Sequence, residues 1–341
     1  MAARNTGRSF GDARPAAHSR RAVVLVRPQR LHTEGACTRL KVPLALLASC
    51  LLSSACSGAG ALGGVSTTPA SADPVYLVIR SDDAGMSHSV NMGLERLIAS
   101  GTPVSVSVMF ACPWYQETVE LLKRNPGVSA GIHLTLNSEW KNYRWGPVSG
   151  RSAVPTLVDS TGFFFPSSAA LHANKPDLRE VELELRAQLE RARRSGLRID
   201  YVDYHMGTVS GNADFRAIAE RLAAEYGLGM SQYFGETYHD PQYAVPPSEK
   251  PDTLVALVGR LRPRVNLLVT HVGIDDAELG ALIDMNVSFP LPDMSKHRQG
   301  ELDALLSPRF REALRARNIR LITYRDLIQM QGLQSMRRPG G

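Results

Sequence analysis

Cysteine is scarce in this chain of 341 residues, and its distribution excludes several kinds of site. Three of the four cysteines lie within the first 56 residues, and only Cys112 remains beyond them. An internal disulfide and a cysteine-rich structural zinc site are therefore excluded from the main part of the chain. We interpret Cys112 as a small, buried apolar residue rather than a nucleophile.

An excess of positive charge is also missing from most of the chain, although the formal net charge of the whole is +6. Residues 1–56 hold nine of the 39 Lys and Arg and two of the 33 Asp and Glu. The remainder has 30 basic and 31 acidic residues, which is a net charge of −1. Because a nucleic-acid-binding domain needs a basic face, we predict no nucleic-acid partner.

The apolar stretch near the start of the chain is too short and too interrupted to cross a membrane as a helix. It follows Lys41 and ends in small residues, which is typical of an export signal. Residues 47–50 (Leu-Ala-Ser-Cys) resemble a bacterial lipobox, and residues 53–56 are a weaker match; cleavage near Ala55 without lipidation is the alternative. We therefore expect an exported bacterial protein, either periplasmic or anchored to the membrane by an N-terminal lipid.

Composition divides the chain into four parts. We predict an export leader over residues 1–56, a flexible tether rich in Gly, Ala and Ser over 57–73, a single domain over 74–330 and a disordered tail over 331–341. The third part is large enough to bury one continuous core.

Short apolar runs alternate with amphipathic segments throughout this domain. The runs are typical of buried parallel strands and cover residues 75–80, 104–110, 128–134, 199–204, 228–232, 265–271 and 319–323. The predicted helices cover residues 91–99, 114–124, 178–195, 214–226, 250–260 and 300–317. The alternation predicts an α/β fold with seven parallel strands. Because no Gly-rich phosphate turn follows the first strand, a closed or nearly closed (β/α) barrel fits better than a nucleotide-binding sheet.

Aspartate and histidine residues stand at the ends of several predicted strands. They are Asp82 and Asp83 after the first strand, His133 and His205 at the third and fourth, and His271 at a later one. The C-terminal ends of barrel strands share one face, so we expect these side chains to converge there. A structural, hydrogen-bonded role is the alternative for any single histidine. Two histidines and one carboxylate leave open positions on a catalytic metal such as zinc, iron, manganese or cobalt.

Two adjacent carboxylates can divide the work of a hydrolase. Neighbouring side chains of a strand point apart, so Asp82 and Asp83 need a turn to face one site, and Ala84 and Gly85 can supply it. One carboxylate can then bind a metal while the other accepts a proton from water, whose pKa falls to about 7 on a metal. The alternative is that an aspartate caps the helix that follows, unless Ser87 is the cap.

Five short segments of the domain match motifs that occur together in one known family. They are residues 80–87 (RSDDAGMS) followed by Val90-Asn91, residues 131–136 (GIHLTL), 203–206 (DYHM), 270–273 (THVG) and 298–305 (RQGELDAL). Together they resemble the YdjC-like (ChbG/HpnK) carbohydrate deacetylase family, and the resemblance runs from about residue 75 to residue 327.

This resemblance implies a (β/α) barrel of the glycoside hydrolase/deacetylase type that removes N-acetyl groups from an acetylated oligosaccharide or glycan. It implies a divalent metal ion, with Mg²⁺ and Zn²⁺ as the candidates. The implied roles are metal ligands for Asp83, His133 and His205, base for Asp82 and acid for His271. The chain departs from the family's pattern at Ala84, where Phe is common, and at Val272, where Pro is common. We expect both to line the site, where they affect the substrate rather than the chemistry.

The long segment after the third predicted strand is rich in aromatic residues. Trp140, Tyr143 and Trp145 offer flat faces on which sugar rings can stack, and we predict that they bind substrate. The alternative is that they pack this segment onto the barrel rim. Arg298 is a further candidate for substrate binding, although a salt bridge with Glu301, one helical turn away, is the favoured interpretation.

Three functions remain open on the sequence. The first is hydrolysis of an acetyl group from an N-acetylated or O-acetylated sugar. The second keeps the metal and the barrel but performs phosphoester hydrolysis or sugar isomerisation, which usually require more basic or more carboxylate residues. The third is a non-catalytic lipoprotein that binds glycans, which predicts an incomplete metal-ligand set. Because barrels host many reactions, the fold alone does not decide between these functions.

Overall fold

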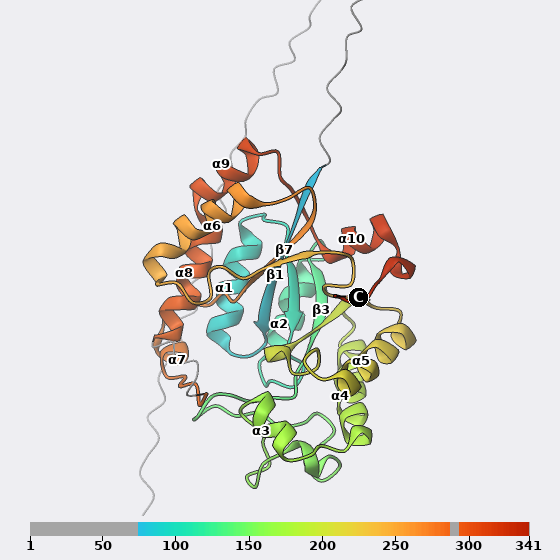
Figure 1. Ribbon diagram of the computed structural model, residues 1–341. Helices are drawn as coiled ribbons and strands as arrows, with labels where there is room; N and C mark the ends of the chain where they lie inside the picture. The colour runs from blue at the N-terminus through green and yellow to red at the C-terminus, as the bar shows by residue number, and fades with distance from the viewer. Residues whose placement is uncertain (1–73, 287–292, 341) are drawn as a thin grey trace, which may run out of the picture. The chain divides into compact units, whose positions relative to one another are not determined.

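The computed structural model describes residues 74–286 and 293–340 (Figure 1). The leader, the lipobox and the tether that we predict for residues 1–73 lie outside the described residues. Within the described part of the chain, no helix is both long and apolar enough to span a membrane.

A single parallel sheet organises the described residues. Its strands lie in the order β5-β4-β3-β2-β1-β7-β6, and β8 pairs separately with β1. The strands are β1 (Val75–Ala84), β2 (Ser105–Val108), β3 (Ser129–Leu134), β4 (Ile199–Tyr204), β5 (Gly229–Met230), β6 (Thr237–His239), β7 (Arg264–Thr270) and β8 (Arg320–Ile322). Since β5 and β6 end the path without pairing to each other, the sheet is an incompletely closed barrel. The predicted (β/α) barrel is confirmed.

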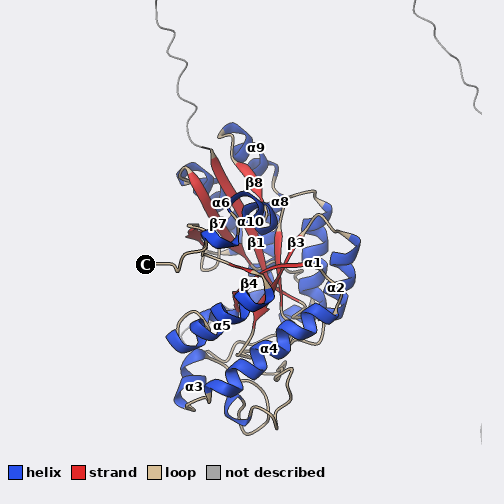
Figure 2. Cartoon of the chain, turned by 90° about the vertical axis from the view of Figure 1, so that its right-hand side faces the viewer, coloured by secondary structure: helices blue, strands red, loops and turns tan. Residues whose placement is uncertain are grey.

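Helices surround the strands (Figure 2). They are α1 (His88–Ala99), α2 (Tyr115–Arg124), α3 (Ser168–Ala173), α4 (Leu178–Arg194), α5 (Ala213–Tyr226), α6 (Lys250–Arg260), α7 (Ala277–Gly280), α8 (Met294–Leu306), α9 (Pro308–Ala316) and α10 (Tyr324–Gln331). Ser87 caps α1, because its side chain accepts a hydrogen bond from the backbone of Val90. Ser87 was one of the two caps that the sequence left open. The two aspartates before it are therefore not needed as caps.

Several elements differ from the prediction, among them α3, α7 and α10, which no predicted helix covers. The strand β6 was missed, because its three residues (Thr-Tyr-His) are partly exposed and form no apolar run. The single helix expected over residues 300–317 is instead two helices, α8 and α9, and α8 begins earlier, at Met294. They separate at Ser307, which caps α9, and Pro308 occupies the first turn of α9, where its missing N–H costs nothing.

Aromatic side chains fill the barrel beneath the strand ends. The rings of Tyr201, on β4, and Tyr324, at the start of α10, have centroids 4.3 Å apart, and both residues are fully buried. The Tyr201 ring occupies the space beside Gly131 on β3, where an added Cβ would lie only 2.4 Å from a ring carbon. The strand β3, which carries His133, therefore packs directly against the ring of Tyr201.

Residues 331–341 were predicted to be a disordered tail, but the described residues of this segment contact the domain. A 3-10 helix at Leu333–Ser335 follows α10. The backbone N–H of Arg337 then donates to the carbonyl of Tyr233 at 2.8 Å. The side chain of Arg338 pairs with Glu220 on α5, with Nε 2.8 Å from the carboxylate. These polar contacts join residues 333–338 to the domain, and apolar periodicity could not have revealed them.

Replacing Gly131 by alanine is expected to destabilise the protein by about 1–3 kcal/mol, because the new methyl group overlaps the Tyr201 ring. The free energy of unfolding from denaturant titration checks this value. Gly127→Ala, just before β3, is the matched control, since no atom lies within 4 Å of its added Cβ. Equal stabilities of the two variants would contradict the packing described here.

Candidate active site

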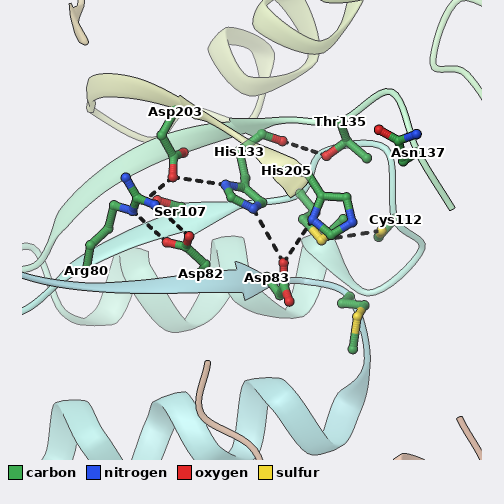
Figure 3. Close-up of polar contacts among 12 residues, drawn as sticks. Arg80, Asp82, Asp83, Ser107, Cys112, His133, Thr135, Asn137, Asp203 and His205 are labelled. Carbon is green, nitrogen blue, oxygen red and sulfur yellow. Dashed lines mark hydrogen bonds and ion pairs between the residues drawn. The ribbon is translucent and has the colours of Figure 1, made fainter. Parts of the chain in front are cut away.

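The five residues predicted to be catalytic or metal-binding line one cavity at the C-terminal ends of the strands. Its volume is about 440 Å³. Asp82 and Asp83 lie near the end of β1, and His133 lies near the end of β3. His205 directly follows β4, and His271 directly follows β7. The parallel sheet therefore brings together side chains that are far apart in sequence (Figure 3 shows the first four).

The backbone of Asp83 turns two adjacent carboxylates towards the same cavity. Asp83 has φ of +63°, in the left-handed region, and the pairing of β1 with β2 is irregular between Ser81 and Ala84. This conformation costs free energy in most residues, but aspartate tolerates it better than most. We expected a turn at Ala84 and Gly85 to bring the carboxylates together. Instead, the reversal of side-chain direction occurs one residue earlier, at Asp83 itself.

Asp83, His133 and His205 present three ligand atoms to one point. The Oδ1 atom of Asp83 lies 3.4 Å from His133 Nε2 and 3.2 Å from His205 Nδ1 (Figure 3). One ligand atom from each residue lies within 4.8 Å of the others. The Oδ1 atom is buried and makes no well-aligned hydrogen bond within the described residues. A divalent cation is the ligand that would satisfy this donor set.

The second nitrogen of each histidine is held by a carboxylate. His133 Nδ1 lies 3.0 Å from Asp203 Oδ2, and His205 Nε2 lies 3.0 Å from Glu139 Oε2. Metal-binding histidines usually have such a partner, which sets the ring orientation and the tautomer. The arrangement around His133 and His205 therefore fits metal ligands.

Nearby buried carboxylates raise the pKa values of His133 and His205. Burial lowers the pKa of His133, but Asp203 and Asp82 outweigh it and raise that pKa to about 10. Burial likewise lowers the pKa of His205, while Glu139 and Asp83 raise it to about 9. Without a metal both imidazoles are therefore protonated at neutral pH. A metal ion that binds there must displace these protons.

Asp82 is oriented by Arg80, which precedes it by two residues on β1. Arg80 Nε donates to Asp82 Oδ1 and Nη2 donates to Oδ2, both at 2.7 Å. The same Nε lies 3.0 Å from Asp203 Oδ2, and Nη1 donates to Ser231 Oγ at 2.6 Å. Asp82, His133 and Asp203 form a second compact group of potential ligand atoms. In this group the guanidinium of Arg80, rather than a metal ion, pairs with the two carboxylates.

Comparison with known proteins identifies the family. The model of the family described as YdjC-like protein matches residues 76–316. The chain belongs to the YdjC-like family.

Curated relatives match this chain along most of their length. A carbohydrate deacetylase of Thermoanaerobacter pseudethanolicus is 26% identical over 60% of this chain and 83% of its own. A carbohydrate deacetylase of Brevibacillus brevis is 26% identical over 74% of this chain and 99% of its own. A crystal structure from Enterococcus faecalis, provisionally described as a cellobiose-phosphate cleavage protein, superposes with a TM-score of 0.63 at 24% identity. It covers 74% of this chain and 99% of its own, and supports the fold.

Two of the four residues expected to bind substrate line the cavity of this YdjC-like protein. These are Trp140 and Arg298. Tyr143 and Trp145 are not among the lining residues: the Tyr143 hydroxyl donates to the carbonyl of Met86, and Trp145 Nε1 donates to a backbone carbonyl at 2.7 Å. Both side chains pack the long segment onto the barrel, which was the alternative interpretation.

Three further expectations need correction. The expected salt bridge between Arg298 and Glu301 is not the one that forms, because Arg298 Nη2 donates to Asp83 Oδ2 at 2.6 Å. Ala84 and Val272 were expected to line the site, but both are buried in the core and neither is among the lining residues. These two departures from the YdjC-like pattern therefore alter packing behind the cavity rather than its surface.

Several residues of the site were missed in the sequence. Arg80, Asp203 and Glu139 support the aspartate and the two histidines, and Tyr238 and Met206 lie at the cavity with 45% and 43% of their surfaces exposed. A charged residue inside an otherwise apolar strand could have identified two of them, Arg80 on β1 and Asp203 on β4. Nothing in the local pattern marks Glu139, because it reaches His205 across the fold.

The metal-free protein is expected to lose stability as the pH rises from about 6.5 towards about 10. The folded pKa values of His133 and His205 are raised above 6.5, so their pairing stabilises the fold fully below the unfolded pKa. That contribution is lost as the pH rises through the folded values. Thermal unfolding of chelator-treated protein over this range measures the effect. The double variant His133→Gln/His205→Gln should show a shallower dependence; an equal slope would contradict this origin.

Replacing Asp203 by asparagine is expected to weaken metal binding by about 10- to 100-fold, because His133 loses the carboxylate that orients it. Competition with a chelator measures the affinity. Asp200→Asn is the matched control: Asp200 lies on the same strand but accepts from Ser129 and Arg325, outside the cavity. Unchanged affinity in Asp203→Asn would mean that this carboxylate does not support the metal site.

Proposed function

We propose that this YdjC-like protein is a metal-dependent hydrolase that removes acetyl groups from N-acetylated, or alternatively O-acetylated, carbohydrate. One observation carries the proposal: the donor trio Asp83, His133 and His205 lies in the same cavity as Asp82, an ionisable group that Arg80 orients. The curated relatives are named carbohydrate deacetylases, and they match this chain along most of their length.

Asp83, His133 and His205 would hold the divalent ion. Two imidazoles and one carboxylate suit Zn²⁺ better than Mg²⁺, which prefers oxygen ligands. Such an ion, when bound, polarises a carbonyl group and makes water more acidic. Arg298, which donates to the second oxygen of Asp83, would keep that carboxylate directed at the ion.

The protein's own groups would move the protons of the reaction. Water adds to the acetyl carbon, and Asp82 accepts the proton that the water loses. The C–N bond then breaks, its electron pair goes to the nitrogen, and His271 supplies the proton that makes the amine a leaving group. The products are acetate and the free amino sugar. Asp82 lies within 4.8 Å of His133, beside the donor trio, and His271 lines the same cavity.

The alternative functions have less support in this cavity. Phosphoester hydrolysis benefits from cations that are available to the phosphate, but Arg80 pairs with Asp82 and Arg298 pairs with Asp83. A non-catalytic glycan-binding role does not require a complete donor trio with an oriented carboxylate beside it. Deacetylation uses every one of these groups.

The purified protein is expected to bind one divalent ion and to release acetate from N-acetyl-chito-oligosaccharides. His133→Ala and His205→Ala should lose the metal and the activity together. Asp82→Asn should keep the metal but lower kcat by roughly 10²- to 10⁴-fold, because the proton acceptor is gone. Acetate release and metal content, measured on the same samples, check both parts.

The exposed variant Asp252→Asn is the control, since Asp252 pairs with Arg309 on the surface. A fully active Asp82→Asn variant would show that the base is another residue. A wild-type protein that binds the metal but releases no acetate from any acetylated sugar would overturn the proposed function.

A further inference from the structure

A buried ion pair lies directly behind the cavity. The side chains of Lys250, at the start of α6, and Glu301, on α8, are 0% and 3% exposed. Lys250 Nζ lies 3.4 Å from Glu301 Oε1, and it also donates to the backbone carbonyl of Gln242. Neither charged residue is among those that line the cavity.

Glu301 uses its second oxygen to hold the end of β7. Its Oε2 atom accepts a hydrogen bond from the backbone N–H of His271 at 2.7 Å and another from Thr270 Oγ1 at 2.9 Å. These are the residues at which β7 delivers the proposed proton donor to the cavity. Glu301 therefore fixes the backbone that carries the His271 ring.

The helix α8 contacts the cavity at two places. Arg298 and Glu301 are three residues apart, so their side chains project from the same face of the helix. Arg298 donates to Asp83, the proposed metal ligand, and Glu301 holds His271, the proposed acid. One helix thus connects the metal side of the cavity to the side that would protonate the leaving group.

Close packing holds α8 in place. An added Cβ on Gly300 would lie 3.1 Å from Lys250 Cδ and 3.2 Å from Pro247 Cα. An added Cβ on Gly273, two residues after His271, would lie 3.2 Å from Arg298 Cβ. Both contacts leave little free space around α8, which packs closely against Lys250 and against the segment that follows β7.

Stability alone is a weak explanation for this pair. Burying a lysine and a glutamate removes both from water, and replacing such a pair by apolar residues is often neutral or stabilising. Desolvation lowers the pKa of Lys250, which shows that the site disfavours its charge. The pair supplies what apolar residues cannot: an oriented acceptor for the N–H of His271.

We propose that Glu301, held by Lys250, is a positioning residue that sets the place of His271 for proton transfer to the leaving amine. The inference rests on the proposed function, because it concerns the step in which the C–N bond breaks. It predicts a defect that depends on the leaving group. An amine needs the proton from His271, whereas a nitrophenolate leaves without one.

Two double variants that differ only in the acceptor test the inference. Lys250→Met/Glu301→Gln removes both charges but keeps a carbonyl oxygen for His271 and Thr270. Lys250→Met/Glu301→Leu removes the charges and the acceptor. Both lack an unpaired buried charge, so both are expected to fold, and their thermal unfolding midpoints and metal contents verify this.

The Leu variant is expected to lower kcat on N-acetyl-chito-oligosaccharides by roughly 10- to 100-fold, with KM changed by less than about threefold. Its kcat on 4-nitrophenyl acetate should stay within about threefold of the wild type, because that ester needs no acid. The Gln variant should retain both activities within about threefold.

Glu184→Leu is the matched control for the loss of a buried acceptor. Glu184, on α4, accepts bonds from the backbone of Val148 and Ser149 at 2.9 Å, as Glu301 does from His271, but it does not line the cavity. It should lower stability without changing the ratio of amide to ester turnover.

The outcomes separate this inference from the proposed function. If the wild type releases no acetate from any acetylated sugar, the function fails and the inference with it. If it releases acetate only from O-acetylated sugars, only the inference fails. If the wild type is active but the Gln and Leu variants behave alike, only the inference fails. It also fails if the Leu variant loses both activities equally, or if Glu184→Leu shows the same selective loss.

Discussion

Compensation of buried negative charge is the constraint on which the site depends. Asp82, Asp83 and Asp203 are withdrawn from water at one end of the barrel, and an isolated buried carboxylate is costly. Arg80 and Arg298 offset part of that cost from two directions, one from within β1 and one from α8. The donor set that remains, around Asp83 Oδ1, is where a metal ion would complete the compensation.

The guanidinium groups of Arg80 and Arg298 orient side chains on two different sides of the cavity. Arg80 connects Asp82 to Asp203 and thereby to His133, on the side that would accept the proton from water. Arg298 holds Asp83, and Glu301 on the same helix holds the backbone of His271. The proposed metal ligand, base and acid thus take their orientation from charged groups that need not contact the substrate.

Much of this arrangement was predictable, because a parallel barrel places the ends of its strands on one face. Apolar runs located seven of the eight strands, and Asp82, Asp83, His133 and His205 stood at their ends. Other contacts were not predictable, because they join residues distant in sequence. The Arg298 side chain illustrates this: local spacing favoured Glu301 as its partner, but the fold brings Asp83 within 2.6 Å of it.

The sequence by itself determined the barrel, the strand ends that carry chemistry and, through its motifs, the family. Those features depend on short-range periodicity and on residue type at strand ends. Only the tertiary structure decided that Asp83 turns into the cavity through a left-handed backbone, since sequence favoured a turn one residue later. It also decided that Glu139 holds His205 and that Tyr143 and Trp145 pack the segment instead of lining the cavity. These contacts depend on packing between residues that are distant in sequence, and a local sequence pattern does not indicate them.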